Sequence, residues 1–150
     1  MIKTWVLLLI LTLVTPTPGL ACECHANDFA AVASSADFVV LARIGKIREF
    51  KSGSWTMKLD VTRVVRGPIP QGDIVVGGLG TSCEWGSGEF TVAGGKDREW
   101  VFALDRKALM KGRYFLWLCS RQWARIKTAE LGGDYTVAEV EQLALQRSAE

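Results

Sequence analysis

The sequence predicts a small, mainly β protein, a closed barrel of five or six short strands with one helix at each end. Apolar and polar residues alternate with the period of a strand in several segments, most clearly at residues 55–62. Two other segments, near residues 28 and 136, carry helix start signals. The strands follow one another without the helices of a βαβ pattern, which favours a barrel over a parallel sheet.

Residues 1–21 have the pattern of a secretory signal peptide. Lys3 precedes an unbroken apolar run at residues 5–14, a Thr-Pro-Thr-Pro segment follows, and small residues stand third and first before Cys22. The run is too short for a permanent membrane anchor. We therefore expect cleavage after Ala21 and a mature domain, residues 22–150, that begins with Cys22. The alternative is a membrane-anchored lipoprotein acylated at Cys22, but that motif requires Leu at the position of Gly19.

The composition indicates one exported domain. The mature chain has 129 residues, which is the 150 of the sequence less the 21 of the leader, and this is enough for one hydrophobic core. The leader contains Lys3 and no acidic residue, so the net charge falls from +2 to +1. Such a balance gives no electrostatic signature of binding to nucleic acid or an anionic membrane. We expect a secreted or periplasmic monomer.

The four cysteines are expected to form disulfides, because they follow an export signal and will meet an oxidising compartment. Four cysteines allow three connectivities, and their number does not choose among them. A bond between Cys22 and Cys24 would close a small strained ring, so the longer pairings are favoured.

The first half of the mature chain is expected to hold a helix and three strands. Asp28 is a helix N-cap, and a helix over residues 28–35 would place four apolar residues on one face: Phe29, Val32, Ala33 and Ala36. A strand over residues 38–47 follows, then a turn at residues 51–54. The next strand covers residues 55–65 and its alternation slips at residues 63–65, as at a β-bulge. A third strand covers residues 73–79 and is weakened by two glycines.

The second half is less regular. Residues 84–98 are rich in glycine and charge, with a short strand at residues 89–92. Two buried strands are expected over residues 100–104 and 114–119. Thr136 and Glu139 form a capping box, and the helix that they begin, over residues 137–147, is expected to pack three side chains on the sheet: Val137, Val140 and Ala144.

A chain that opens on Cys22-Glu23-Cys24 and continues with a helix, a barrel and two distant cysteines resembles the tissue inhibitors of metalloproteinases. More broadly it is similar to the netrin-like (NTR) module, a Greek-key barrel of the OB-fold type. The resemblance extends over nearly all of residues 22–125, and the segments that carry it are 22–24, 29–40, 57–67, 81–83 and 112–119. The chain has no cysteine between Cys24 and Cys83 and no second, cysteine-rich domain, so we expect a version with the N-terminal domain alone.

The resemblance implies the disulfides Cys22–Cys83 and Cys24–Cys119. It also implies that the free amine and the carbonyl oxygen of Cys22 chelate the catalytic zinc of a target metalloprotease and displace its water. Glu23 would enter the pocket of the protease beside that zinc. The family usually places a small or uncharged residue there, and a carboxylate in an apolar pocket is costly.

Three further residues are candidates for contact with the partner. The resemblance places Thr81 and Ser82 beside the N-terminus as a second contact ridge. Trp85 lies in a glycine-rich loop close to Cys83 and is a candidate anchor. Three other tryptophans are expected in the core on their strand spacing: Trp55, Trp100 and Trp117. Three basic residues, Arg121, Arg125 and Lys127, form either a patch or an ordinary solvated face.

Other functions would use the same residues differently. A non-inhibitory, protein-binding NTR-like module would share the fold, and a redox-active Cys22-Glu23-Cys24 would need a free thiol of low pKa. The single histidine, His25, could join those cysteines as a metal ligand only if their thiols were free. The chain cannot build a catalytic zinc site with several histidines, nor an evident catalytic triad. We therefore expect a protein that is not an enzyme and needs no cofactor.

Overall fold

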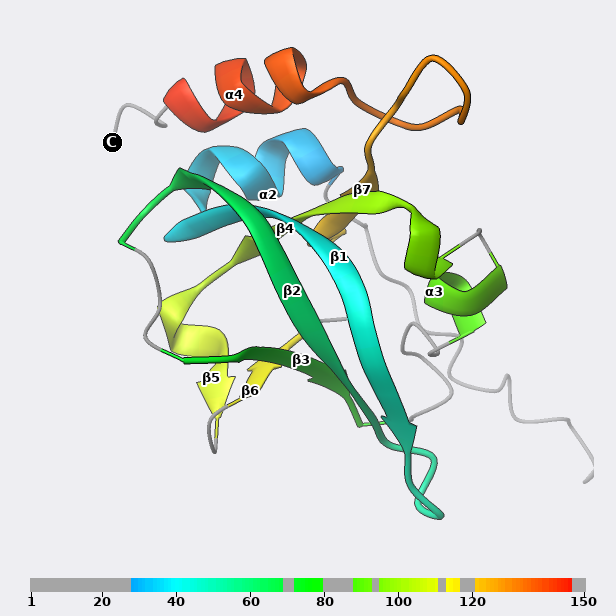
Figure 1. The fold of residues 1–150 in the computed structure, drawn as a ribbon. Helices are drawn as coiled ribbons and strands as arrows, with labels where there is room; N and C mark the ends of the chain where they lie inside the picture. The colour runs from blue at the N-terminus through cyan, green and yellow to red at the C-terminus, as the bar shows by residue number, and fades with distance from the viewer. Residues whose placement is uncertain are drawn as a thin grey trace, which may run out of the picture.

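The computed structural model describes residues 28–68, 72–79, 88–92, 95–110, 113–116 and 121–146, which form one curled sheet with helices against it (Figure 1). The strands are β1 (Phe38–Glu49), β2 (Trp55–Arg66), β3 (Ile74–Gly78), β4 (Glu99–Leu104), β5 (Leu109–Met110), β6 (Arg113–Phe115) and β7 (Trp123–Arg125). The helices are α2 (Phe29–Ser35), α3 (Gly88–Val92) and α4 (Val137–Leu145), with the single turns η1 (Gly95–Asp97) and η2 (Arg106–Ala108). The predicted mainly β class with a helix before and after the strands is confirmed.

The sheet has the strand order β5-β6-β3-β2-β1-β4-β7. Every neighbouring pair is antiparallel except β3 and β6, which run parallel. The long strands β1 and β2 bend across the centre of the sheet and curl it around its inner face (Figure 1). Among the described residues β5 and β7 are the two edges and do not pair with each other, so the described part of the sheet is a curled half-barrel.

The β1–β2 hairpin forms where the sequence predicts it. Phe50 N–H donates to Ser54 O at 2.9 Å, and Gly53 supplies the positive φ of 82° that the turn requires. Further along, Val39 pairs with Arg66 while Val40 pairs with Val64, so β2 carries one extra residue between these pairs. This is the bulge that the slipped alternation predicts.

The core has two parts, one on each face of the sheet. The inner face is filled mainly by aromatic and large aliphatic side chains, among them Trp55, Met57, Phe90, Trp100, Phe102 and Trp123. The outer face packs against α2 and α4 through a second group that includes Phe29, Val32, Ala33, Val101, Val140 and Ala144. The helices therefore cover one face while the sheet curls around the other (Figure 1). Trp55 and Trp100 are core residues, as expected.

The two larger helices begin at the predicted caps. The Asp28 carboxylate accepts from Ala31 N–H at 2.9 Å, and Thr136 Oγ1 accepts from Glu139 N–H at 3.3 Å. Glu139 Oε2 accepts in return from Thr136 N–H at 2.7 Å, which completes the capping box and lowers the pKa of Glu139. Val140 and Ala144 are buried on the sheet side of α4, as the sequence predicts, and Val137 is partly buried there.

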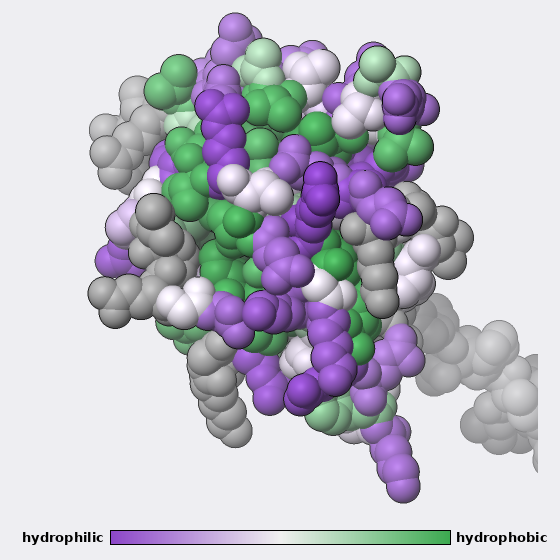
Figure 2. Space-filling model, viewed as in Figure 1, coloured by the Kyte–Doolittle hydropathy of each residue, from purple (hydrophilic) through white to green (hydrophobic). Residues whose placement is uncertain are grey.

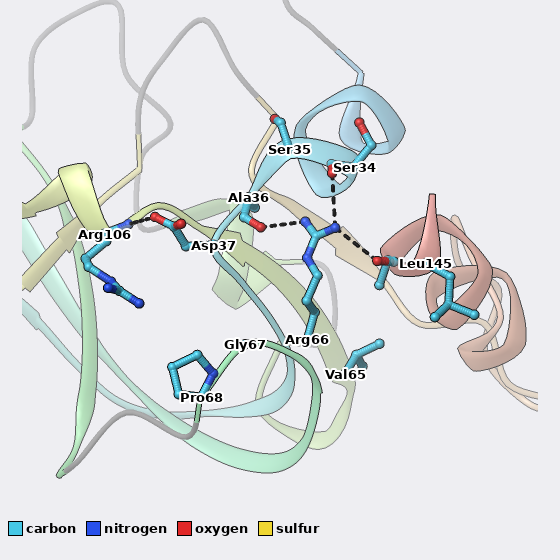
Figure 3. A pocket seen from close by; sticks show the side chains of 11 residues that line it. Ser34, Ser35, Ala36, Asp37, Val65, Arg66, Gly67, Pro68, Arg106 and Leu145 are labelled. Atoms are coloured by element: carbon cyan, nitrogen blue, oxygen red, sulfur yellow. Dashed lines mark hydrogen bonds between the residues drawn. The ribbon is translucent and has the colours of Figure 1, made fainter. Parts of the chain in front are cut away.

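Arg66, the last residue of β2, ties the ends of both helices together (Figure 3). Its Nη1 donates to Ser34 O and to Ala144 O, each at 3.0 Å, and its Nη2 donates to Ala36 O at 2.5 Å and to Ala33 O. These carbonyls belong to the C-terminal ends of α2 and α4, where helical carbonyls lack partners within the helix. A single guanidinium thus fixes α2, α4 and β2 to one another.

Residues 88–92 are a helix, and the prediction of a strand at 89–92 is wrong. Four residues are too few for their apolar periodicity to distinguish a helix from a strand. The packing of their side chains therefore decides the conformation. The helical turn places Phe90, fully buried, 5.2 to 5.5 Å from the rings of Trp55, Trp100 and Trp123. α3 therefore fills one end of the curled sheet. The strand predicted at 114–119 ends earlier, at Phe115, and residues 117–119 lie outside the described residues.

Hydrophobic side chains also reach the surface, between polar ones, on the face shown in Figure 2. Among the described residues, the large apolar ones that are exposed are Phe50, Val61, Leu79, Leu109, Leu131 and Leu145. Leu145, in the last turn of α4, is the most exposed of these at 82 %. In the described part of the chain no helix has the length and apolar character needed to cross a membrane.

Candidate functional site

The residues that the sequence singles out lie just outside the described ranges: Cys22, Glu23, Cys24, His25, Thr81, Ser82, Cys83, Trp85, Trp117 and Cys119. The neighbouring residues that the structure describes still show where these segments start. They are Asp28 at the start of α2, Leu79 after β3, Leu116 after β6, and Arg121 before β7. In Figure 1, α2 begins and β3 ends on the same side of the molecule. We call this side the N-terminal edge and assign to it these four residues and residues 134–135.

The ends of β3 and β6 lie side by side at the N-terminal edge. These two strands are parallel, with Val76 opposite Tyr114 and Gly77 opposite Phe115. Leu116 N–H then donates to Gly77 O at 3.0 Å. The chain therefore leaves both strands in the same direction and from neighbouring positions. Cys83 follows Leu79 by four residues and Cys119 follows Leu116 by three, so both cysteines are close in sequence to one place in the fold.

The start of α2 is held by Tyr135. The ring of Phe29, almost fully buried, lies 5.3 Å from the ring of Tyr135. Burial raises the pKa of the Tyr135 hydroxyl, and the nearby negative charge of Asp28 raises it further. In Figure 1, α2 begins on the side of the molecule toward which β3 and β6 point. Phe29, the first residue of α2, is therefore held in position by the ring of Tyr135.

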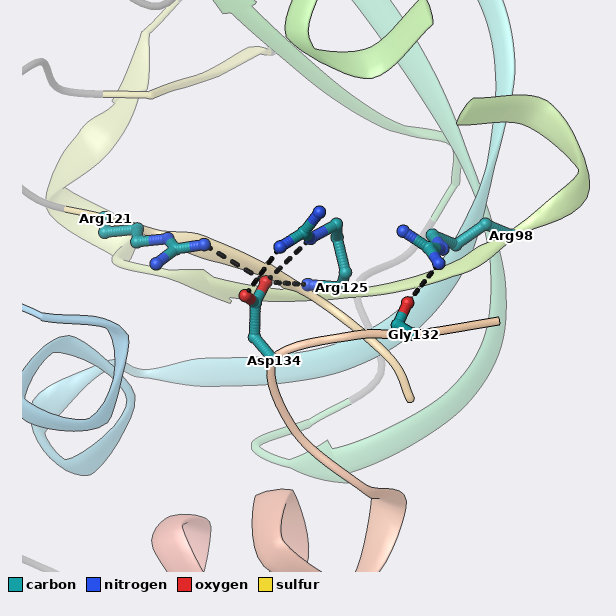
Figure 4. A network of polar contacts seen from close by, with 5 residues as sticks. All are labelled: Arg98, Arg121, Arg125, Gly132 and Asp134. Carbon is teal, nitrogen blue, oxygen red and sulfur yellow. Dashed lines mark hydrogen bonds and ion pairs between the residues drawn. The ribbon is translucent and has the colours of Figure 1, made fainter. Parts of the chain in front are cut away.

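Asp134, the residue before Tyr135, binds two arginines, Arg121 and Arg125 (Figure 4). Its Oδ2 accepts from Arg125 N–H at 3.0 Å, from Arg125 Nε at 3.1 Å and from Arg121 Nη2 at 3.1 Å, and its Oδ1 accepts from Arg125 Nη2 at 3.0 Å. The side-chain bonds of Arg125 are the main reason that the pKa of Asp134 falls to about 2. Burial opposes this fall, and the Arg125 N–H and the charge of Arg121 add to it.

Arg98 fixes the loop that carries Asp134. Its guanidinium is buried and its Nη2 donates to Gly132 O (Figure 4). Lys127 N–H donates to Tyr135 O at 2.7 Å, and Ile126 and Tyr135 form a parallel bridge. The segment from β7 to α4 is thus bonded back onto β7, which makes residues 134–135 a rigid support.

Residues 134–135 connect two parts of the chain that are far apart in sequence. Phe29 contacts Tyr135, and Arg121 binds Asp134. Cys24 precedes Asp28 by four residues, and Cys119 precedes Arg121 by two. Residues close in sequence to Cys24 and to Cys119 therefore contact two adjacent residues, Tyr135 and Asp134.

The sequence identified the basic residues near the end of the chain but not their role. Arg121 and Arg125 turn toward Asp134, whereas Lys127 is exposed, so the three do not act as one basic patch. Asp134 itself was missed. The signal for it is Gly133, which precedes it, because a side chain at Gly133 would lie 2.5 Å from Lys127 N. A glycine of this kind indicates a close approach of two backbone segments.

Among the described residues, no group of three or more His, Cys, Asp or Glu side chains is arranged to hold a metal ion. The hydrogen bonds around residues 134–135 make them a rigid support for the start of α2. Comparison of this sequence with models of known protein families and with curated proteins finds no match in either.

Proposed function

We propose that this protein is an exported inhibitor of a zinc metalloprotease and acts through the amine and carbonyl of Cys22. The sequence pattern of residues 22–24 after a leader supports the proposal, together with the resemblance to the tissue inhibitors. The curled sheet with helices on its outer face is consistent with their OB-type barrel. Closure of that barrel and its two disulfides, Cys22–Cys83 and Cys24–Cys119, are part of the proposal.

The observation that carries the proposal is the convergence at the N-terminal edge. β3 and β6 end side by side, and Phe29 and Arg121 meet on Tyr135 and Asp134. The segments that lead to Cys83 and Cys119 therefore leave the sheet on the side of the molecule where α2 begins (Figure 1). The proposal requires that these segments bring the cysteines of each pair within the span that a disulfide bridges.

The chemistry needs a free amine that is held rigidly. A catalytic protease zinc has three protein ligands and an open position for water. An α-amino group has an ordinary pKa near 8, so at neutral pH the loss of its proton to allow zinc binding costs little. Two disulfides would order the N-terminal residues when the protein folds, so this entropy is not lost again on binding. Both thiols are consumed in this arrangement, and no sulfur binds the metal.

Glu23 restricts which proteases fit. Its carboxylate would enter the pocket beside the zinc, where an apolar lining and a catalytic glutamate would each oppose it. A target with a basic residue in that pocket would instead form an ion pair with Glu23. Thr81, Ser82 and Trp85 would contact the same protease beside the N-terminus. We therefore propose a target whose pocket carries positive charge.

The proposal is tested by inhibition assays with a set of zinc metalloproteases, some of which have basic pockets. The mature protein is compared with a variant that carries one extra alanine ahead of Cys22, and with a control that carries the alanine after Glu150. The extension displaces the amine from the zinc, so we expect at least a hundredfold loss of potency with unchanged thermal stability. The control should keep full potency. Equal inhibition with and without the N-terminal alanine would contradict zinc chelation and favour a general protein-binding module.

A further inference from the structure

A cleft of about 620 Å³ lies at the end of β2 that is remote from the N-terminal edge. The first residue of β2 pairs with Gly78, at the N-terminal edge, and its last residue is Arg66, in the wall of the cleft. We call this space the helix-end cleft, because the C-terminal ends of α2 and α4 form two of its sides (Figure 3). Its volume falls in the range of sites that bind ligands of small-molecule size.

Arg106 offers a positive charge at one side of the cleft. Its guanidinium lies over the ring of Phe38, with Cζ 5.5 Å from the ring centre. The Asp37 carboxylate accepts from the backbone N–H of Arg106 at 2.7 Å, and the ion pairs among the described residues do not include the Arg106 guanidinium. A guanidinium stacked on an aromatic ring keeps its N–H edges available in one plane, a geometry that suits a carboxylate.

Arg66 places a second guanidinium in the wall, held by four carbonyls at the helix ends. Among the described residues that line the cleft, the charged side chains are those of Arg66, Arg106 and Asp37. The exposed guanidinium of Arg106 favours a ligand that carries negative charge.

The side of the cleft away from Arg106 is apolar (Figure 3). Val65 lies there, and Leu145 stands beside it with 82 % of its surface exposed. Leu145 therefore adds an exposed aliphatic surface to the apolar side of the cleft. A small anion would occupy the side of Arg106 and leave Leu145 uncovered. A peptide can cover both sides, because neighbouring residues can present an acidic and an aliphatic side chain.

We propose that the helix-end cleft binds an extended peptide segment of a partner protein. An acidic side chain of that segment pairs with Arg106, and an aliphatic side chain packs against Val65 and Leu145. The cleft is at the other end of β2 from the N-terminal edge, so the two sites can be occupied together. This inference does not depend on inhibition of a protease.

The test is an NMR titration of the ¹⁵N-labelled mature protein with two acetylated, amidated pentapeptides, Ala-Leu-Glu-Leu-Ala and Ala-Leu-Gln-Leu-Ala. With the Glu peptide we expect saturable shifts of the amide signals of Gly67, Arg106 and Leu145. The Gln peptide should bind at least fivefold more weakly, because it lacks the charge that pairs with Arg106. Equal binding of the two peptides, or no saturable shift with the Glu peptide at millimolar concentration, would overturn the proposal.

Two variants, each with a matched control, identify the residues that bind the peptide. Arg106→Gln should weaken binding of the Glu peptide at least fivefold, whereas Lys107→Gln, an exposed neighbour outside the cleft, should bind as the wild type does. Leu145→Ser should also weaken binding, and Leu131→Ser, exposed elsewhere, should not. All four changes are at exposed positions, so the amide spectra should show folded proteins. Unchanged binding by Arg106→Gln would contradict the proposed pairing.

Discussion

The indole of Trp55 occupies the space that a side chain at Gly78 would need. A Cβ at position 78 would lie 2.7 Å from Trp55 Nε1 and 3.0 Å from its Cε2. The two residues face each other across β2 and β3. The glycine that interrupts β3 in the sequence is therefore what allows a large aromatic residue to be buried next to it.

Gly78→Ala should lower the free energy of unfolding by about 1–3 kcal/mol, the usual cost of overpacking a core. Denaturation in urea, followed by tryptophan fluorescence, measures the change. Gly88→Ala is the control, because nothing lies within 4 Å of a Cβ built there. A Gly78→Ala protein as stable as the wild type would show that Trp55 is not confined in this way.

Phe90→Ala should lower the free energy of unfolding more than a substitution at Gly78, Arg66 or Asp134. The Phe90 ring contacts Trp55, Trp100 and Trp123, and no part of its surface is exposed. Removal of such a ring leaves a cavity and typically costs about 3–5 kcal/mol.

The control for Phe90→Ala is Phe50→Ala, since Phe50 is 44 % exposed and its removal should cost far less. Urea denaturation of both proteins gives the two free energies of unfolding. Similar stabilities of the two variants would contradict the placement of α3 at the end of the sheet.

Arg66→Met should lower the free energy of unfolding by about 2–4 kcal/mol, because it leaves helix-end carbonyls without their donor. Arg66→Lys should recover only part of this loss, since one ammonium cannot reach carbonyls on both helices in the geometry of a planar guanidinium. Arg63→Met is the matched control. Arg63 forms an exposed ion pair with Glu141, and such pairs contribute little. Equal effects at positions 63 and 66 would refute the role of Arg66.

Asp134 should make stability depend on pH in the acid range. Its pKa is about 2 in the folded protein and 3.8 ordinarily. A carboxylate whose pKa is lowered by folding stabilises the protein above its ordinary pKa, and this contribution disappears as the pH falls from 3.8 through 2. Asp134 is 17 % exposed, and the contribution at neutral pH is on the order of 2 kcal/mol.

Asp134→Asn should therefore be less stable than the wild type at pH 7 and should lose less stability on acidification. Urea denaturation at a series of pH values measures both effects. Asp73→Asn, which removes an exposed ion pair with Lys58, should leave the pH profile nearly unchanged. A parallel decline of stability in the wild type and in Asp134→Asn would show that Asp134 is not the group responsible.

Features encoded locally could be predicted from the sequence. The caps at Asp28 and Thr136 each involve residues three positions apart, so both helices were placed correctly. The strands β1 and β2 are long enough for their apolar periodicity to be clear. Residues 89–92 are too few for that, and the helix there is decided by the aromatic side chains around Phe90.

The contacts that organise the ends of the molecule could not be predicted, because they join residues far apart in sequence. Arg66 reaches Ala144 across 78 positions, and the parallel pairing of β3 with β6 depends on the curl of the whole sheet. At the candidate site the four cysteines and the pattern of a signal peptide can be read from the sequence. The contacts of Tyr135 with Phe29 and of Asp134 with Arg121 are tertiary features.

The most direct test of the proposed function is mass spectrometry of the exported protein without reduction, after digestion with a protease that cleaves after glutamate. Cleavage after Glu23 separates Cys22 from Cys24 and so allows each disulfide to be assigned. We predict an unmodified Cys22 amine as the N-terminus, with Cys22 linked to the peptide of Cys83 and Cys24 to that of Cys119. A retained leader, a diacylglycerol mass on Cys22, or free thiols at these positions would contradict the account.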